Sequence, residues 1–411
     1  MAGVAASHQS TIKAVNKKRV IRALWENSPV SRTGLARLTG LNKATITNLI
    51  GEIEADGMIR NVGQQHGPGA GRNANLIMLN ERYGVCAAIT VRTREFTVSI
   101  GNIFAETLWE RKLCHTPADN PMDVLERTAA LLHEGIAACS AVSSRLLGIC
   151  IGAGSLVRHP DDMIYAMHST LKWYNVPLGE FFRSRFAVPI RVDTGSNFAM
   201  LGEVYFGSAK GVSNALFITS GLGIGGSLLI DGQIYRGANG FAGDIGHFSI
   251  DPNGPLCPCG NRGCWEIMGS ALALAPDLPL DEAIRRAEQG DVGCIGQFSR
   301  IGQNLGRGIA NLIRVLNPER VIIGGDIVLA GKWVMNPCRT ELQTRLWPFV
   351  WERTELQFST LGNRSILFGC YAGVLEPLFT PLALLFQFSA CAAFSRAIRP
   401  SRASSSSQRP T

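Results

Sequence analysis

Gly240-Phe-Ala-Gly-Asp244-Ile-Gly-His247 and Cys257-Pro-Cys259-Gly-Asn-Arg-Gly-Cys264-Trp-Glu266 form the most informative segment of this 411-residue chain. Three thiolates and one imidazole make up a tetrahedral zinc set, and the short spacing with glycines lets a loop wrap the ion. Because protein side chains fill all four positions, the site is predicted to be structural rather than hydrolytic. We predict structural Zn²⁺ on His247, Cys257, Cys259 and Cys264. The alternative is chance clustering of cysteines in one loop.

The same segment carries a candidate ligand site. Asp244, His247 and Glu266 would converge on one point once the metal folds the loop. Carboxylates and imidazole suit hydroxyl-rich ligands such as sugars. In the alternative interpretation, the two acids are simply solvated loop residues.

Upstream of this segment lies a glycine-rich turn, Thr219-Ser-Gly-Leu-Gly-Ile-Gly-Gly226, between two strand-like runs. Glycines there allow backbone N–H groups to approach a phosphate without interference from side chains. The alternative is an ordinary β-turn. Gly324-Gly325, which follows the strand-like Val321-Ile-Ile323, is a second weak candidate of the same kind.

The segments around these motifs suggest an internal duplication. Strand-like runs occupy 85–89, 96–100 and 146–151, with a helical segment near 122–138, and a comparable series restarts at 215–219 and 226–230. A helix over 301–316 and a strand over 320–323 complete the second series. Two passes of strands and helices predict an α/β body of two lobes, with a cleft between them, over residues 83–376.

The first 80 residues have a different organisation. Apolar spacing predicts a helix over 14–26. A second, short helix is capped by Ser31 and directs Leu35, Ala36 and Leu38 inward, and a third helix is capped by Asn42. Strand-like runs at 58–62 and 75–79 flank a glycine-rich turn. Three helices followed by a two-stranded ribbon predict a winged helix-turn-helix over 12–80.

The charge distribution supports nucleic-acid binding by this segment. Residues 1–75 hold ten Lys/Arg against four acids, a net charge of +6 in a chain of net charge +8. Polar residues on the third helix, namely Lys43, Thr45, Thr47 and Asn48, are expected to reach base edges, and Lys18 and Arg72 to contact phosphates. The alternative is a winged-helix module that binds protein.

Composition restricts the remaining possibilities. Hydrophobic residues make up 46% and charged residues 18%, so a globular protein is predicted and a disordered one is excluded. The eleven cysteines are mostly scattered singly, which suits a reducing cytoplasm, and the lysine-rich first 25 residues do not resemble a signal peptide. Residues 377–411 are predicted to form an irregular apolar and then serine-rich tail. Its prolines and small residues argue against a membrane span.

Taken together, the motifs at 240–247 and 257–266 resemble the signature of the ROK family (repressors, open reading frames, kinases). The resemblance covers about residues 12–376 and is to the family's winged-helix repressors, such as those responding to xylose, glucose or N-acetylglucosamine. It implies an actin-like, sugar-kinase-type fold of two lobes, a structural zinc, a sugar in the cleft, and a homodimer or homotetramer on operator DNA. By similarity Asp244 (Glu in most of the family), His247 and Glu266 would touch sugar hydroxyls.

The chain departs from the kinases of that family at two places. Family kinases begin the first lobe with Asp-x-Gly-x-Thr, where this chain has Ala88-Ile-Thr-Val-Arg92. The kinase Asn-Asp pair, whose Asp accepts the proton of the sugar hydroxyl, aligns with Thr194-Gly195. Glycine has no proton acceptor, so general-base catalysis is lost, unless an alignment shifted by two residues allows Asp193 to substitute.

These observations predict a cytoplasmic, non-enzymatic transcriptional regulator that represses genes of sugar uptake or catabolism and senses a sugar or sugar derivative. Two alternatives remain open at this stage. One is a sugar kinase that phosphorylates a hexose with ATP, which the loss of the base at Gly195 disfavours. The other is a repressor controlled by a partner protein, with the body as a scaffold.

Overall fold

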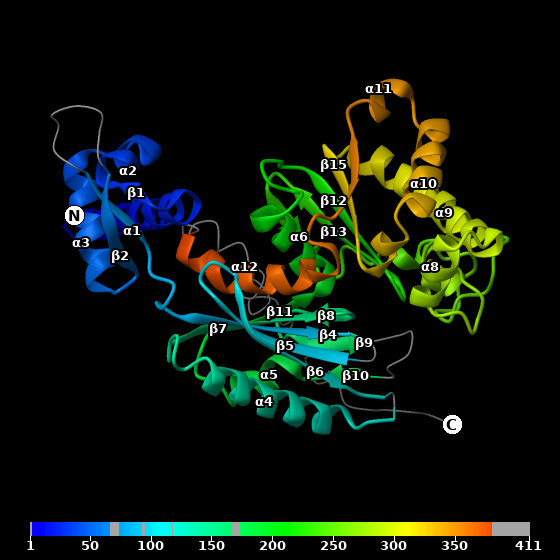
Figure 1. The fold of residues 1–411 in the computed structure, drawn as a ribbon, viewed down its shortest axis with the longest axis horizontal. Helices are drawn as coiled ribbons and strands as arrows, with labels where there is room; N and C mark the ends of the chain where they lie inside the picture. Colours follow the sequence, from blue (N-terminus) through cyan, green and yellow to red (C-terminus); the bar gives the residue numbers. More distant parts are fainter. Residues whose placement is uncertain (1, 66–73, 93–94, 117, 167–172, 380–411) are drawn as a thin grey trace, which may run out of the picture. The chain divides into compact units, whose positions relative to one another are not determined.

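The computed structural model describes residues 2–65, 74–92, 95–116, 118–166 and 173–379 (Figure 1). Its described residues form two compact units, one of residues up to 80 together with 376–379 and the other of residues 81–375. None of the helices within the described ranges is long and apolar enough to cross a membrane. The tail from residue 380 onward lies outside these ranges.

The first unit contains three helices and a small sheet. Its elements are α1 (Ala2–Asn27), β1 (Val30–Ser31), α2 (Arg32–Thr39), α3 (Lys43–Ala55), β2 (Ile59–Gln65) and β3 (Ala74–Leu79). The strands are ordered β1-β3-β2, and β2 and β3 pair antiparallel. Buried Leu24, Leu35, Ile46 and Ile50 contribute to the core of this unit.

The predicted helix starts are confirmed by their hydrogen bonds. The Ser31 hydroxyl accepts from the Gly34 N–H, and the Asn42 side chain accepts from the Thr45 N–H at 2.8 Å. The prediction that Leu38 faces inward is wrong, because this side chain is 48% exposed and Thr39 is buried in its place. Thr39 can be buried since its hydroxyl donates to the Leu35 carbonyl oxygen at 2.6 Å.

The last turn of α12 (Ser365–Phe379) also belongs to the first unit. Phe379 is buried, and its ring centroid lies 5.0 Å from that of Trp25 in α1. The first unit is therefore completed by residues that come about 300 positions after its last strand.

The first lobe of the second unit is built on a five-stranded sheet. The strands, in spatial order, are β11 (Ile190–Thr194), β7 (Leu146–Ala153), β4 (Val85–Val91), β5 (Glu95–Asn102) and β6 (Thr107–Cys114). Strand alternation directs Ile100 toward α4 (Pro121–Ala138) on one face and Gly101 toward Tyr371 of α12 on the other. Helices therefore cover both faces of this sheet (Figure 1).

The second lobe repeats this plan. Its sheet is ordered β14 (Gln233–Tyr235), β13 (Ile224–Ile230), β12 (Ala215–Ser220), β15 (Arg320–Gly324) and β16 (Glu355–Phe358). In both lobes an antiparallel meander of three strands is extended by two parallel strands on the side of its first strand. This topology confirms the predicted duplication.

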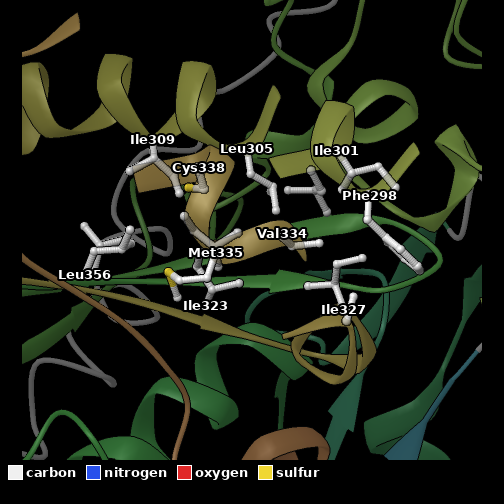
Figure 2. Close-up of a cluster of buried hydrophobic side chains, with 14 of the residues drawn as sticks. Phe298, Ile301, Leu305, Ile309, Ile323, Ile327, Val334, Met335, Cys338 and Leu356 are labelled. Carbon is white, nitrogen blue, oxygen red and sulfur yellow. The ribbon is translucent and has the colours of Figure 1, made fainter. Parts of the chain in front are cut away.

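Two long helices pack on the second sheet. These are α9 (Val292–Leu316) and α10 (Lys332–Arg345), and Figure 2 shows Ile301, Leu305 and Ile309 of α9 against residues of α10 and β15. The helix predicted over 301–316 begins nine residues earlier, because Asp291 caps it by accepting the Cys294 N–H.

The remaining elements are short or connect the lobes. They are β8 (Leu156–Arg158), β9 (Met163–Ala166), β10 (Tyr174–Val176), α5 (Leu178–Arg183), α6 (Gly195–Phe206), α7 (Trp265–Gly269), α8 (Leu280–Glu288), α11 (Pro348–Trp351), and the 3-10 turns η1 (Ile245–His247), η2 (Ala271–Ala273), η3 (Asp326–Ala330) and η4 (Gly362–Arg364). Among these, α6, α7, η1 and η3 carry residues of the candidate site.

Candidate functional site

The four predicted metal ligands lie together between η1 and α7. One ligand atom from each of His247, Cys257, Cys259 and Cys264 lies within 4.8 Å of the others. The Nδ1 of His247 is 3.8 Å from the Cys257 Sγ, and the Sγ atoms of Cys259 and Cys264 are 3.6 Å apart. Tetrahedral metal–ligand bonds of about 2.0–2.3 Å place neighbouring ligand atoms at about 3.5–3.8 Å. The cluster could therefore bind a metal ion in tetrahedral geometry.

The environment of these thiols also fits a cation. Burial raises the pKa of the Cys264 thiol to about 12 and also raises the pKa of Cys257. A thiolate in such a place needs a nearby positive charge, which a divalent metal supplies. The donor set of three sulfurs and one imidazole is that of structural zinc sites.

The glycines of the segment allow its loop to pack closely on β13. The Gly226 N–H donates to the Gly243 carbonyl oxygen at 2.9 Å, and a Cβ on Gly243 would lie 2.3 Å from the carbonyl oxygen of Gly226. A Cβ on Gly246 would likewise lie 2.3 Å from the Ile224 carbonyl oxygen. Larger residues at these positions would push the metal loop away from the strand.

A cavity of about 550 Å³ lies between the two lobes. Its lining includes Asp244, His247 and Glu266 from the metal segment, together with Thr194 and Gly195. The three residues predicted to bind a hydroxyl-rich ligand thus share one cavity. Because His247 also points its Nδ1 at Cys257, the metal cluster fixes one wall of this cavity.

Glu266 has a second partner in the glycine-rich turn. Its Oε2 accepts a hydrogen bond from the Ile224 N–H at 3.1 Å, and a Cβ on Gly223 would lie 2.6 Å from the same oxygen. One of the N–H groups expected to approach a phosphate is therefore bound to a carboxylate of the protein.

Three further lining residues were not predicted as ligand contacts. Phe241 precedes Asp244 by three residues in the same segment, and its ring centroid lies 5.8 Å from that of Tyr165. Arg92 and Asp326 come from opposite lobes, and their charged groups are 3.5 Å apart. Asp326 directly follows Gly324-Gly325, and this position could have marked it in the sequence as a cavity residue.

Comparison with known proteins identifies the family. The ROK family pattern matches residues 86–376. The chain belongs to the ROK family. A xylose repressor from Bacillus spizizenii is 29% identical over 90% of this chain and 97% of its own length. A glucokinase from Halalkalibacterium halodurans is 32% identical but matches only 55% of this chain and 75% of its own length.

Solved structures show the same fold. The crystal structure of a ROK family transcriptional regulator, described as a homolog of the E. coli Mlc protein, has a TM-score of 0.76. It is 24% identical and covers 92% of this chain and all of its own. The second unit therefore has the actin-like sugar-kinase fold of ROK proteins.

Gly195, which the resemblance aligns with the base of the ROK kinases, is among the residues that line the cavity. Thr194 ends β11 and caps α6, its hydroxyl accepting from the Asn197 N–H at 3.2 Å. Gly195 begins α6, and a Cβ there would lie 3.1 Å from the Ile366 side chain. Gly195 itself offers no side-chain proton acceptor to the cavity.

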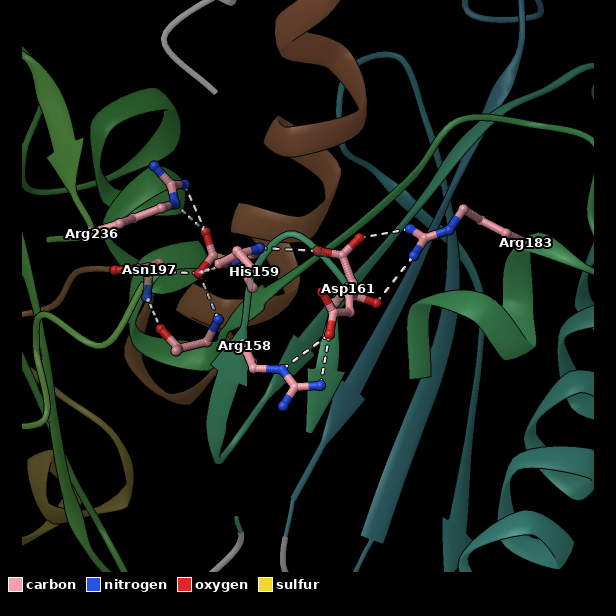
Figure 3. Close-up of polar contacts among 9 residues, drawn as sticks. Arg158, His159, Asp161, Arg183, Asn197 and Arg236 are labelled. Carbon is pink, nitrogen blue, oxygen red and sulfur yellow. Dashed lines mark hydrogen bonds and ion pairs between the residues drawn. The ribbon is translucent and has the colours of Figure 1, made fainter. Parts of the chain in front are cut away.

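Asp193, the other candidate base, is buried and contacts Arg236, Asn197 and His159, three residues that Figure 3 labels. It is 5% exposed and absent from the described lining of the cavity. Arg236 lies 2.7 Å from its Oδ2, and the Asn197 amide donates to its Oδ1 at 2.7 Å. Burial opposes ionisation, yet Arg236, His159 and Asn197 hold the Asp193 pKa well below its usual range. A carboxylate so paired is a poor proton acceptor.

His159 directly follows β8 and connects this network to the three-stranded sheet β10-β9-β8 of the second unit. Its Nδ1 lies 3.0 Å from Asp162 and its Nε2 lies 4.0 Å from Asp193. The hydrogen bond with Asp162, together with Asp193, raises the pKa of His159 to about 9. Arg183 in turn pairs with Asp162 at 2.6 Å.

The network predicts a loss of stability at alkaline pH. A group whose pKa is raised on folding stabilises the native state below its unfolded pKa, and the effect is lost as the pH rises through the folded value. We expect the free energy of unfolding to fall between pH 7 and 10, with about 1 kcal/mol of that fall due to this partly exposed imidazole. In His159→Gln the fall should be smaller by that amount, as measured by urea unfolding. His133→Gln, which removes a ring stacked on Phe186, is the control and should keep the full slope.

The predicted DNA contacts lie in the first unit. Lys43, Thr47 and Asn48 are exposed on α3, and Thr45 is half-buried there. Lys18 of α1 is half-buried, and burial lowers its pKa, whereas Arg72 lies outside the described residues. The neighbouring Lys17 pairs with Asp56 at 2.7 Å, which ties α1 to the end of α3.

Proposed function

We propose that this ROK protein is a sequence-specific DNA-binding repressor whose second unit senses a sugar or sugar derivative. The observation that carries the proposal is the extent of the similarity. The xylose repressor matches 90% of the chain, whereas the glucokinase matches 55% of it. Gly195, which has no side chain to accept a proton, also favours a repressor over a kinase.

The first unit is proposed to act as a winged helix-turn-helix. The arrangement of α2, a tight turn at Gly40 and α3, followed by the β2–β3 ribbon, supports this role. Because Ile46, Leu49 and Ile50 pack inward, α3 presents its polar face to a major groove. Repressors of this kind bind two half-sites as dimers, so we also propose a homodimer or homotetramer.

We expect the two kinds of DNA contact to separate in a salt titration. Lys43→Ala with Asn48→Ala should abolish the preference for operator over random DNA, because base edges are read from α3. Lys18→Ala should weaken binding to both DNAs equally. The slope of the logarithm of the binding constant against the logarithm of the salt concentration should become shallower by about one. Fluorescence anisotropy from 50 to 200 mM salt measures both quantities. Identical behaviour of the two variants would contradict the assignment of α3.

The second unit is proposed to bind its sugar through Asp244, His247 and Glu266, with structural Zn²⁺ holding the loop that carries them. Sugar binding that favours one arrangement of the lobes would bias the oligomer and change the spacing of its recognition helices. The cluster geometry and the shared cavity support these roles.

The direct test is a footprint on the DNA upstream of the protein's own gene, repeated with D-xylose, D-glucose and N-acetylglucosamine. The expected result is a protected near-palindrome that one sugar releases or strengthens. Protection that no sugar changes would instead favour control by a partner protein. Absence of protection at every salt concentration would overturn the DNA-binding proposal.

We further propose that the protein has no sugar kinase activity. With ATP, magnesium and the same sugars, ADP release should equal that of the sugar-free blank, because neither Gly195 nor the ion-paired Asp193 can accept the hydroxyl proton. A ROK glucokinase assayed in parallel is the positive control. Any saturable sugar-dependent turnover would contradict this expectation.

A further inference from the structure

The glycine-rich turn between β12 and β13 is flanked by carboxylates. Glu266 accepts the Ile224 N–H, as described above. Three residues earlier, a Cβ on Gly221 would lie 3.5 Å from the Asp326 Oδ2 and 3.7 Å from the Asp326 backbone nitrogen. The Gly221 N–H donates to the Gly223 carbonyl oxygen at 3.0 Å within the turn. Neither this N–H nor that of Ile224 is thus free to face a bound phosphate, and the Asp326 carboxylate lies beside the turn.

Asp326 also holds the nearest guanidinium. The Arg92 Nη1 lies 3.5 Å from its Oδ2, and both side chains are one-third exposed to the cavity side of the lobes. Arg92 follows β4 in the first lobe, and Asp326 begins η3 in the second. An arginine fork recognises a carboxylate and a phosphate by the same geometry. The Asp326 carboxylate therefore takes the place that an anionic ligand group would occupy on Arg92.

The remaining charges of the cavity act in the same direction. The described lining holds one guanidinium, Arg92, against four carboxylates, which are Glu95, Asp244, Glu266 and Asp326. Glu95 is paired with Lys112 at 3.0 Å, so three carboxylates face the single guanidinium. An anion entering this cavity would meet like charges at close range, whereas sugar hydroxyls would find acceptors.

We propose that Asp326, paired with Arg92, is a specificity-determining residue that substitutes for a ligand phosphate and makes the effector an uncharged saccharide. The proposal rests on the sugar-sensing function stated above. Nucleotides and phosphorylated sugars are excluded by the carboxylates at the glycine-rich turn. The Arg92–Asp326 pair offers its remaining donors and acceptors to hydroxyl groups of the sugar.

Isothermal titration of the full chain tests the proposal. The probes are D-xylose, D-glucose and N-acetylglucosamine, each compared with a phosphate monoester of the same sugar, and magnesium ATP. In the wild type the sugar that binds should do so at least tenfold more tightly than its monoester. Asp326→Asn frees Arg92 and removes one negative charge, so it should tighten binding of the monoester at least tenfold.

Two further variants make the result specific. Arg92→Gln combined with Asp326→Asn should lose the gain in monoester affinity, because the released guanidinium is then missing. Asp281→Asn, which removes an exposed carboxylate of α8 outside the cavity lining, should leave the preference for the uncharged sugar as in the wild type.

Three outcomes overturn the proposal, and they are distinguishable. Tighter binding of a monoester or of magnesium ATP than of the uncharged sugars by the wild type would refute it while leaving sugar sensing intact. An unchanged monoester affinity in Asp326→Asn would refute the role of this residue alone. Failure of every sugar and every monoester to bind would overturn the sugar-sensing function together with the inference.

Discussion

Replacing Cys259 by serine is expected to release one metal ion per chain and to lower the free energy of unfolding by several kcal/mol. The cluster fixes the loop between η1 and α7, and at structural sites the free energy of metal binding contributes directly to folding. Serine keeps the volume of the side chain but is a much poorer zinc ligand. Metal analysis of the purified protein gives the stoichiometry, and guanidinium unfolding gives the stability.

Cys114→Ser is the matched control for this experiment. Cys114 is an exposed free cysteine at the end of β6, outside the metal cluster. It should keep its full zinc content and wild-type stability. Retention of stoichiometric zinc by the Cys259 variant would refute the ligand assignment.

Glu266→Gln is expected to remove the response to the effector while leaving operator binding in place. The carboxylate lines the cavity and also holds the Ile224 N–H, and hydrogen bonds to a charged group contribute about 1.5–3 kcal/mol. Sugar affinity should therefore fall by about tenfold to a hundredfold. Titration calorimetry measures the affinity, and the footprint with and without sugar measures the response.

Glu282→Gln is the control for Glu266. Glu282 pairs with Arg285 and Arg286 on the exposed face of α8, outside the described lining of the cavity. It should bind sugar as the wild type does. An unchanged sugar affinity in Glu266→Gln would remove this residue from the binding site.

Local signals in the sequence predicted those features that depend on neighbouring residues. The metal cluster follows from residue type and spacing within 18 positions, and the helix caps Ser31 and Asn42 follow from their side-chain chemistry. The repeated order of strands predicted the two lobes because buried strands have a strong apolar pattern. These features need no knowledge of distant contacts.

The features that the sequence did not predict depend on residues brought together from different elements. His159, Asp193 and Arg236 lie in separate parts of the chain, and only the folded lobes place them in one network. The same is true of Arg92 and Asp326, which are more than 200 residues apart. The prediction that Leu38 faces inward was wrong because Thr39 is buried instead. The Thr39 hydroxyl donates a hydrogen bond within α2, so this polar side chain can be buried.

The packing of Phe379 on Trp25 has a consequence for the order of events during synthesis. The first unit is discontinuous, because its helices and sheet end at residue 79 while its last aromatic contact is made by residue 379. At ribosomal rates of about 5–20 residues per second, the intervening chain takes on the order of tens of seconds to make. For that time the nascent N-terminal unit exposes the face of Trp25 that Phe379 later covers. The first unit is thus complete only after residue 379 has been made, and a fragment that stops at residue 80 would lack part of its core.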